Sequence, residues 1–468
     1  MKFLFLLAAA LVLTACGGSS GSSAPAWQFF SANNGVNGYQ LWRTDGTDAG
    51  TSMVKVINDG GDADIEVLGS LGRKAVFLAD DGIHGEELWV TDGTEAGTLM
   101  LQDINTGAGD ANVSSFAVAG NTLYFGAYDI VNGNELWKTD GTAAGTVLVK
   151  DINLGVSGSD ISELVSMGSS VYFIANDGIS GYELWASDGT SAGTSLVKNI
   201  APGGGSSFIS EMISADGMLY FNAYDGTAGI ELWKSDGTAA GTEMVKDIFP
   251  GSDGSVPRRF AAMGGHVYFS AAESVAQGYE LWRTDGTAAG TVLVKDINPT
   301  INNSNANFSG SDIRYPFVVG DKLYFIARNI AATNVRQLWV SDGSEAGTVL
   351  LHSAGPVHSL LAASDRVYFE GTDAINGTEL WTTDGTVAGT VLLKDIEPGA
   401  SSSDFFSLGF SYLYENDAVP SIEVAPGVVL FVAYRADLGT ELWKTDGTEA
   451  GTQLIKDINP GSLSAFDS

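Results

Sequence analysis

The stretch ELWKTDGTAAGTVLVKDI, residues 135–152, carries a pattern that recurs along this chain. Nearly the same string returns at 231–248 as ELWKSDGTAAGTEMVKDI and at 441–458 as ELWKTDGTEAGTQLIKDI. Each copy has apolar and β-branched residues on both sides of an Asp-Gly-Thr, which is typical of two strands joined by a tight turn. A hairpin that recurs in this way is the unit of a repeat protein.

Nine tryptophans mark the copies of this stretch. Each follows a leucine and is followed, two positions later, by Thr or Ser and then by Asp-Gly. They are Trp42, Trp89, Trp137, Trp185, Trp233, Trp282, Trp339, Trp381 and Trp443. Most of the spacings are 47 to 49 residues, and a period of this length suits a solenoid, a propeller or an array of separate beads.

One full repeat, residues 161–200, shows what each unit contains. ISELVSMG, SSVYFIAND, GYELWASD and TSLVKNI are four strand-length runs bounded by turn-forming residues. No sustained helical period interrupts them, so we expect a four-stranded antiparallel meander with strands a, b, c and d. The link from d to the next a is the longest, as a propeller requires. The sequence predicts an all-β propeller with nine blades, or eight blades and one irregular unit.

The two ends of the repeat array fit the same scheme. The chain enters it at AWQFFSAN, which matches strand b, so strand a of the first blade is missing. By analogy with residues 401–409, Phe466 falls where a strand a begins. We expect residues 466–468 to pair with the first blade.

The turn and its flanking strands have a structural explanation. A hairpin with Trp137 opposite Leu148 would set Glu135 opposite Lys150, and an opposed Glu and Lys recur in five further copies. The Asp can accept hydrogen bonds from the backbone two or three residues on, and the Gly tolerates positive φ. The motif is therefore predicted to be a structural turn and not a site used nine times.

The ELWKTDGTAAGT string and its copies resemble the bacterial ELWxxDGT repeat family, over residues 27–468. The resemblance implies a propeller-like secreted or surface protein. The turn is also similar to the Asp-box of sialidase-type propellers, where an Asp-Gly-Thr turn joins the third and fourth strands and is structural. The copies here differ from the Asp-box in detailed spacing, and the catalytic arginine cluster of sialidases is not recognisable in this chain.

The N-terminal residues are predicted to be an export signal. Lys2 precedes an apolar run at 3–13, and LTAC at 13–16 resembles a bacterial lipobox. The expectation is a signal peptide at 1–15 and a diacylglycerol on Cys16, the chain's one cysteine. A plain secretory signal is the alternative.

The Gly- and Ser-rich segment 16–26 follows as a flexible tether. Residues 27–468 are then predicted to be a single propeller domain. By resemblance to sorting rules in enteric bacteria, the expected address is the outer membrane, on its periplasmic face or at the cell surface. The lipid would make the membrane one of the protein's partners.

The charge of the chain limits its other partners. It has 56 acidic and 23 basic residues among 468, a formal net charge of −33. Such a surface repels nucleic acid and anionic lipid. The acidity is expected mainly to keep a large β-protein soluble.

Catalytic and metal-binding patterns are weak. The four histidines, His84, His266, His352 and His358, show no metal-ligand spacing, and His352 and His358 are predicted to lie at the surface. The b–c loops hold Asp81, Asp129, Asp177, Asp225 and Asp373. We expect them to form ordinary turns; calcium is the alternative. No cofactor is predicted, and an enzyme is the less favoured interpretation.

Departures from the repeat are better indications of function. Long insertions occur at 298–317 and, between strands a and b of the last unit, at 410–427. The second contains Tyr412, Tyr414, Glu415 and Asp417, an aromatic and acidic group suited to contact with a protein or a glycan. The predicted function is a binding or scaffold module at the bacterial cell envelope. The alternatives are a glycan-acting hydrolase or lyase, and a structural adhesion component of the cell surface.

Overall fold

A computed structural model describes residues 27–299, 310–328, 335–403, 419–420 and 422–466. Five residues with a predicted role lie outside this part of the chain. They are Cys16, Tyr412, Tyr414, Glu415 and Asp417.

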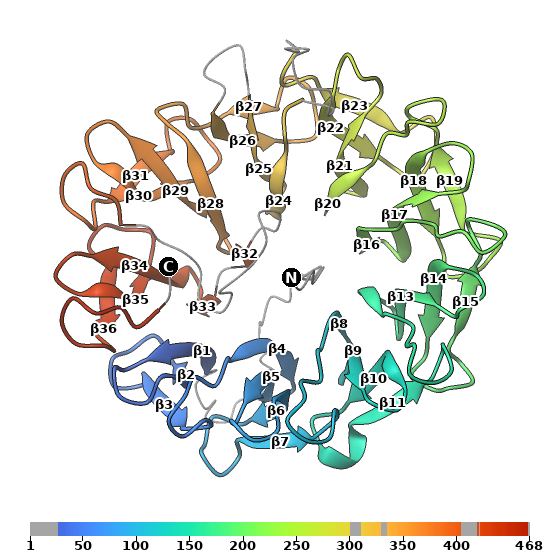
Figure 1. Ribbon diagram of the computed structural model, residues 1–468. Coiled ribbons are helices and arrows are strands. Elements are labelled where there is room, and N and C mark those ends of the chain that lie inside the picture. Colours follow the sequence, from blue (N-terminus) through green and yellow to red (C-terminus); the bar gives the residue numbers. More distant parts are fainter. Residues whose placement is uncertain (1–26, 300–309, 329–334, 404–418, 421, 467–468) are drawn as a thin grey trace, which may run out of the picture. The chain divides into compact units, whose positions relative to one another are not determined.

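The fold is an all-β propeller with nine blades, each an antiparallel sheet (Figure 1). The predicted fold class is confirmed, and strand order within a blade follows the chain. The chain divides into two compact units, one within 112–350 and the other formed by 27–111 with 351–466. Among the described residues, no helix is long and apolar enough to cross a membrane.

The first unit holds blades 3 to 7. Their strands are β8 Phe116–Ala119, β9 Thr122–Asp129, β10 Gly133–Thr139, β11 Val147–Lys150, β12 Ser162–Met167, β13 Ser170–Asn176, β14 Tyr182–Ser187, β15 Ser195–Lys198, β16 Met212–Ala215, β17 Met218–Tyr224, β18 Ile230–Ser235, β19 Glu243–Lys246, β20 Arg258–Met263, β21 His266–Ala272, β22 Tyr279–Thr284, β23 Val292–Lys295, β24 Arg314–Val319, β25 Lys322–Arg328, β26 Arg336–Ser341 and β27 Val349–Leu350. A short 3-10 helix, η1 Ala143–Gly145, lies in the turn after β10.

The second unit holds blades 1, 2, 8 and 9. Their strands are β1 Gln28–Asn33, β2 Tyr39–Thr44, β3 Ser52–Lys55, β4 Glu66–Leu71, β5 Lys74–Asp80, β6 Glu86–Thr91, β7 Leu99–Gln102, β28 Val357–Ala362, β29 Val367–Asp373, β30 Gly377–Thr383, β31 Val391–Lys394, β32 Val419–Pro420, β33 Ile422–Ala425, β34 Val428–Arg435, β35 Gly439–Thr445 and β36 Gln453–Lys456. The short β32 pairs in parallel with β28. Residues 422–425, predicted to lie in the insertion, instead form strand a of blade 9 and pair with β34.

The register of the repeated hairpin differs from the prediction at one point. Trp137 does face Leu148, but a β-bulge follows and sets Lys150 opposite Leu136 instead of Glu135. The extra residue in the bulge is Val149, which is buried. The same shift occurs in all the blades except blade 7, where the described register shows none. The predicted Glu–Lys oppositions are therefore wrong, because a bulge adds one residue to strand d.

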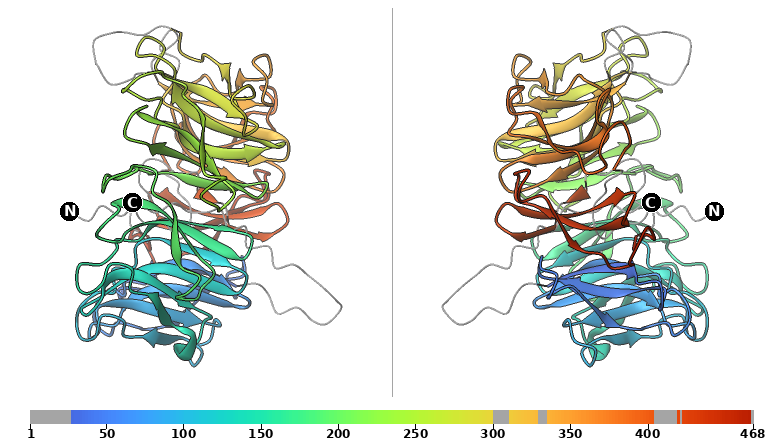
Figure 2. Two further views of the ribbon diagram at one scale, coloured as in Figure 1. Left: turned by 90° about the vertical axis from the view of Figure 1, so that its right-hand side faces the viewer. Right: turned by 90° about the vertical axis from the view of Figure 1, so that its left-hand side faces the viewer.

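Within each unit, neighbouring blades pack face to face through their apolar residues. In one cluster, Leu136 and Val149 of blade 3 pack with Phe173 and Trp185 of blade 4. Burying one such side chain stabilises the fold by about 1.5–3 kcal/mol. Within each blade the connections alternate between the two ends of the strands (Figure 2). The b–c loops and the d–a links therefore lie at the same end.

The C-terminal residues join blade 9 to blade 1 within the second unit. The backbone N–H of Asn33 donates to the carbonyl of Ala465 at 2.9 Å, and the N–H of Ala465 donates to Thr440 at 3.0 Å. The Phe466 ring lies 5.8 Å from that of Phe30. The residue that pairs is thus Ala465, one position before the predicted segment, while Phe466 contributes packing. Residues 467–468 lie outside the described part.

Candidate functional site

The Asp-Gly-Thr turn satisfies its own polar groups. Asp140 Oδ1 accepts hydrogen bonds from the N–H of Thr142 at 3.0 Å and from its hydroxyl at 2.6 Å. The Thr142 hydroxyl accepts in turn from the N–H of Gly145, and the hydroxyls of Thr139 and Thr146 lie 2.8 Å apart. Equivalent bonds form in the other blades, for example around Asp285 and Asp446. The structural interpretation of the motif accounts for these contacts.

The glutamate of the motif has a role that sequence analysis missed. Glu135 is buried, and its carboxylate accepts from the backbone N–H of Ile152 at 3.0 Å and of Asn153 at 3.1 Å. It also accepts from the hydroxyl of Ser159 at 2.7 Å. The side chain thus connects strand c to the link that follows strand d. In the sequence this glutamate is marked only by its recurrence, and the prediction there placed it opposite the recurring lysine.

The lysine of the motif bonds to the next blade instead of to this glutamate. Lys150 Nζ donates to the carbonyl oxygen of Thr194 at 2.8 Å, and Lys198 does the same to Thr242. Each lysine therefore links strand d of one blade to the turn of the following blade.

Burial of the glutamates raises the pKa of their carboxyl groups. The pKa is raised to about 8 at Glu280 and Glu441, and to about 7 at Glu87, Glu231 and Glu379. Perturbed acids often mark active sites. Here, however, the same carboxyl is buried in seven blades, each bonded to backbone amides, so we assign it to the fold.

Two of the four histidines, His352 and His358, were predicted to lie at the surface. His358 is exposed, as predicted. His352 is not: it is buried, with its ring 4.6 Å from that of Trp381 and 5.4 Å from that of Phe369. It occupies the position of the repeat lysine, but the packing of two aromatic rings draws it inward. Desolvation lowers its pKa.

The predicted b–c loop aspartates form turns. Asp177 Oδ1 accepts from the N–H of Ile179 at 2.9 Å and of Ser180 at 2.7 Å. Asp81, Asp129, Asp225 and Asp373 accept from the residues two and three positions on in the same way. Among the described residues, no three His, Cys, Asp or Glu side chains are grouped as a metal site would need.

Two of these b–c loops and the d–a link between them place large aliphatic side chains in solvent. In the first unit, five such residues are between 67% and 83% exposed. They are Ile130 and Val131 in the β9–β10 loop, Leu154 and Val156 in the β11–β12 link, and Ile179 in the β13–β14 loop. We call these five residues the aliphatic patch. Single exposed apolar residues are ordinary, but a group of this kind indicates a contact surface.

Close backbone packing brings the three segments of the patch together. A Cβ placed on Gly133 would lie 2.9 Å from the carbonyl oxygen of Val156. A Cβ placed on Gly178 would lie 2.9 Å from Asn153 Oδ1. The link at 153–158 therefore lies against the loop of blade 3 on one side and the loop of blade 4 on the other.

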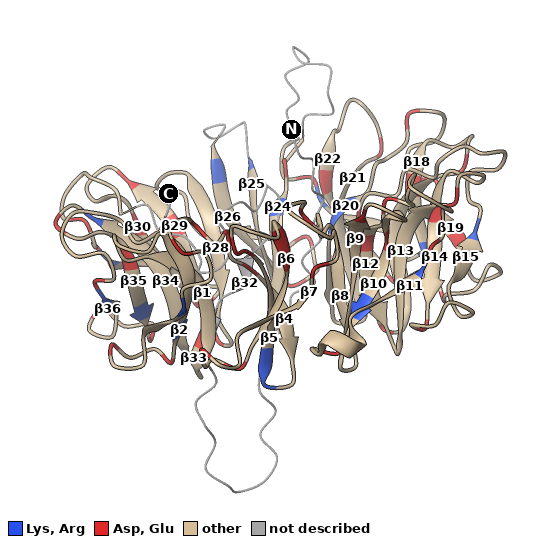
Figure 3. Ribbon diagram, turned by 60° about the horizontal axis from the view of Figure 1, so that its bottom comes forward, with Lys and Arg blue, Asp and Glu red and all other residues tan. Residues whose placement is uncertain are grey.

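The surroundings of the aliphatic patch are acidic. The segments 129–134, 151–161 and 177–182 contain four aspartates and no lysine, arginine or histidine. Figure 3 shows acidic residues on many of the loops. A partner for this surface must therefore tolerate, or better neutralise, negative charge.

In blades 3 and 4 the residue two positions after the loop aspartate, Val131 or Ile179, lies at the tip of the b–c loop. This tip position is aliphatic in three blades of the second unit as well. Val36, Ile83 and Ile375 occupy the place of Val131 in blades 1, 2 and 8 and are at least 67% exposed. Blade 9 differs, because Asp437 stands at this position. The fold therefore does not require an aliphatic residue there.

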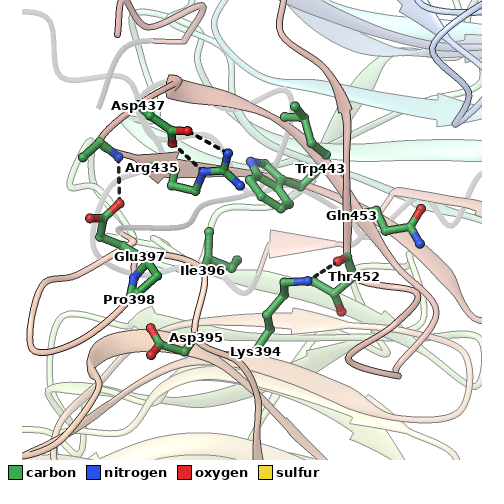
Figure 4. A pocket seen from close by; sticks show the side chains of 12 residues that line it. Lys394, Asp395, Ile396, Glu397, Pro398, Arg435, Asp437, Trp443, Thr452 and Gln453 are labelled. Atoms are coloured by element: carbon green, nitrogen blue, oxygen red, sulfur yellow. Dashed lines mark hydrogen bonds and ion pairs between the residues drawn. The ribbon is translucent and has the colours of Figure 1, made fainter. Parts of the chain in front are cut away.

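A cavity of about 640 Å³ lies between blades 8 and 9 of the second unit (Figure 4). Arg435 lies between Asp437 and the indole of Trp443, with its guanidinium carbon 5.8 Å from the ring centroid. Lys394 Nζ donates to the carbonyl of Thr452 at 2.7 Å at the other side of the cavity. The sequence does not indicate this cavity, because its walls come from two repeats.

Comparison with known proteins extends to the fold and no further. No protein-family model matches the chain, and no functionally curated protein matches it. Among solved structures, a prolyl endopeptidase is similar over 80% of this chain and 55% of its own, with 12% identity and a TM-score of 0.44. A puromycin hydrolase is similar over 73% of this chain and 52% of its own, with 12% identity and a TM-score of 0.38.

The β-propeller domain of the Trilobed protease from Pyrococcus furiosus is similar over 70% of this chain and 98% of its own, with 11% identity and a TM-score of 0.37. This chain thus spans about half the length of the two peptidases just named. At such identities the likeness concerns the β-propeller alone.

Proposed function

We propose that this protein is a lipid-anchored propeller of the ELWxxDGT repeat type that acts as a binding module at the bacterial cell envelope. The observation that carries the proposal is the aliphatic patch. Its five side chains contribute little to the fold where they stand, because most of their surface is in water. Covering them would be favourable by about 25 cal/mol for each Å² removed from solvent.

The chemistry around the patch favours a basic polypeptide with apolar side chains. Apolar residues of the partner would cover Leu154 and Val156, and lysines or arginines at its edge would face Asp160 and Asp177. Opposite charges speed association and exclude wrong partners. A second copy of this chain, with its net charge of −33, would meet like charge.

Photo-crosslinking from the patch tests this function in intact cells. A photoreactive residue at Val156 should form a distinct adduct with a protein of the envelope. The matched control places the same residue at Ala144, which is exposed in the turn at the opposite end of blade 3. Adducts of equal yield from both positions, or none from Val156, would contradict the proposal.

Introducing negative charge into the patch supplies the second arm of the test. Replacing Val131 and Ile179 by Asp should abolish the Val156 adduct. The melting temperature should change little, since substitutions at such exposed positions usually alter stability by less than about 0.5 kcal/mol. If the variant folds normally and the adduct is lost, the partner binds through the aliphatic patch.

A further inference from the structure

The cavity between blades 8 and 9 departs from the repeat in its b–c loop. In blade 4 the loop carries Asp177 and, at its tip, Ile179; in blade 9 the same positions are Arg435 and Asp437. These two form an ion pair, with Nε to Oδ1 at 2.6 Å and Nη2 to Oδ2 at 2.9 Å. Blade 9 has thus exchanged a turn aspartate and an aliphatic tip for a charged pair beside the cavity.

A third departure lies in the link that follows strand d of blade 8. In blade 3, Asn153 follows the isoleucine after strand d and bonds within its own link, to the carbonyl of Gly158. In blade 8 this position is Glu397, whose Oε2 accepts from the backbone N–H of Ala436 in blade 9 at 2.7 Å. Three positions that differ from the repeat therefore converge on one cavity.

Two residues that line the cavity each carry a buried polar atom with no partner in the described part of the chain. Trp443 is only 3% exposed, and its Nε1 donates to no acceptor within the described residues. A carboxylate oxygen of Asp395, Oδ1, is buried and likewise unbonded within that part of the chain. Such a pair recurs in other blades, as at Trp137 and Asp151. What this cavity adds are the charged groups of Arg435 and Asp437 from blade 9 and of Glu397 from blade 8.

The charged groups that line the cavity limit the class of ligand it can bind. Two cationic and three anionic side chains surround the space, so a polyanion would meet carboxylates and a polycation would meet Arg435 and Lys394. An apolar ligand would remove the charged groups of Arg435, Asp437 and Lys394 from water, which is costly. Hydroxyl groups both donate and accept, and so can bond to either sign of charge. A volume of about 640 Å³ lies within the range of about 300–1,000 Å³ found for small-molecule sites.

We propose that this cavity binds a neutral oligosaccharide. Arg435 and Lys394 supply donors, and Asp395, Asp437 and Glu397 supply acceptors. The site goes beyond the protein-binding function proposed above and does not depend on the aliphatic patch. Its loss would leave the Val156 adduct intact, so the two proposals fail separately.

Calorimetric titration of the purified full-length protein tests the site. Maltotriose, cellotriose and chitotriose serve as neutral probes, and trigalacturonate as the acidic counterpart. At least one neutral trisaccharide should bind with a stoichiometry of one, and trigalacturonate should bind at least tenfold more weakly. The absence of saturable binding by all three neutral probes, or tighter binding of the acidic one, would overturn the proposal.

Variants that restore the repeat give the matched comparison. The double substitution R435D/D437I restores the blade 4 residues at these two positions, and should weaken binding at least tenfold. The same pair of residues introduced in blade 2, D81R/I83D, should leave the affinity unchanged. Should the double variant fail to melt cooperatively, E397Q, which keeps the shape of the side chain, should still weaken binding several-fold. Unchanged affinity in folded R435D/D437I and in E397Q would refute the site.

Discussion

The Glu280 carboxylate accepts a hydrogen bond from the backbone N–H of Ile297 at 2.7 Å. In blade 1 the same bond is made by an amide: Gln40 Oε1 accepts from the N–H of Ile57, also at 2.7 Å. An uncharged side chain can therefore accept the same backbone hydrogen bond as the glutamate. The negative charge is not needed for this contact, and burial makes it costly.

The stability of the protein should fall as the solution becomes more alkaline. Burial raises the pKa of Glu280 and Glu441 to about 8, above the ordinary value of 4.5, so the folded state holds their protons more tightly than the unfolded chain does. The stabilising contribution is full below about pH 4.5 and is lost as the pH rises through about 8. Urea titrations at pH 5, 6, 7 and 8 measure the free energy of unfolding. A constant or rising value would contradict this prediction.

Replacing Glu280 separates the role of its shape from that of its charge. E280Q should change the free energy of unfolding at pH 7 by less than about 1 kcal/mol and should weaken its pH dependence. E280A should cost about 2–4 kcal/mol, because it leaves the Ile297 N–H unbonded and opens a cavity. Denaturant unfolding of both variants provides the measurement. Equal losses in the two would mean that the carboxyl itself is required.

The last glycine of the turn should not tolerate a side chain. A Cβ on Gly145 would overlap the carboxylate of Asp140, whereas a Cβ on Gly205 would make only ordinary contacts, the nearest at 3.5 Å. Neither glycine has a positive φ, so steric overlap alone separates them. G145A should lower stability by about 1–3 kcal/mol, as overpacking does, and G205A should be nearly neutral. Thermal melting of the pair checks the difference.

Deleting the last eight residues should destabilise the second unit. The deletion removes Ala465, which bonds to Asn33, and Phe466, which packs on Phe30. Loss of the aromatic packing alone, in F466A, should cost about 3–5 kcal/mol if it behaves as a core residue. The truncated protein should melt at a still lower temperature than F466A. An unchanged transition in both would show that the closure is dispensable.

The proposed lipid anchor predicts where the protein is found in cells. Radiolabelled palmitate should be incorporated into the wild-type protein, which should sediment with membranes. C16S should lose the label and appear in the soluble fraction, because a diacyl anchor supplies most of the membrane affinity. A labelled C16S protein, or an unlabelled wild type, would exclude acylation at this cysteine.

Much of the fold could be predicted from the recurrence of one hairpin. The four runs between 161 and 200 became β12 to β15 within one or two residues at each end. Alternating apolar residues and turn-forming Asp-Gly dipeptides are local signals, readable without knowledge of neighbours. The site was less predictable. The residues chosen for partner binding at 412–417 lie outside the described structure, while the aliphatic patch and the cavity were not anticipated.

The sequence by itself determined the number of units, their strands and the chemistry of their turns, because each of these depends on residues close together in the chain. Tertiary structure alone decided where the glutamates and lysines of the repeat make their bonds. A bulge at Val149 separates Glu135 from Lys150, and each then finds partners that only packing supplies. It also decided which loop residues gather at one surface. Those positions follow from contacts between different repeats, and nothing local in the chain encodes such contacts.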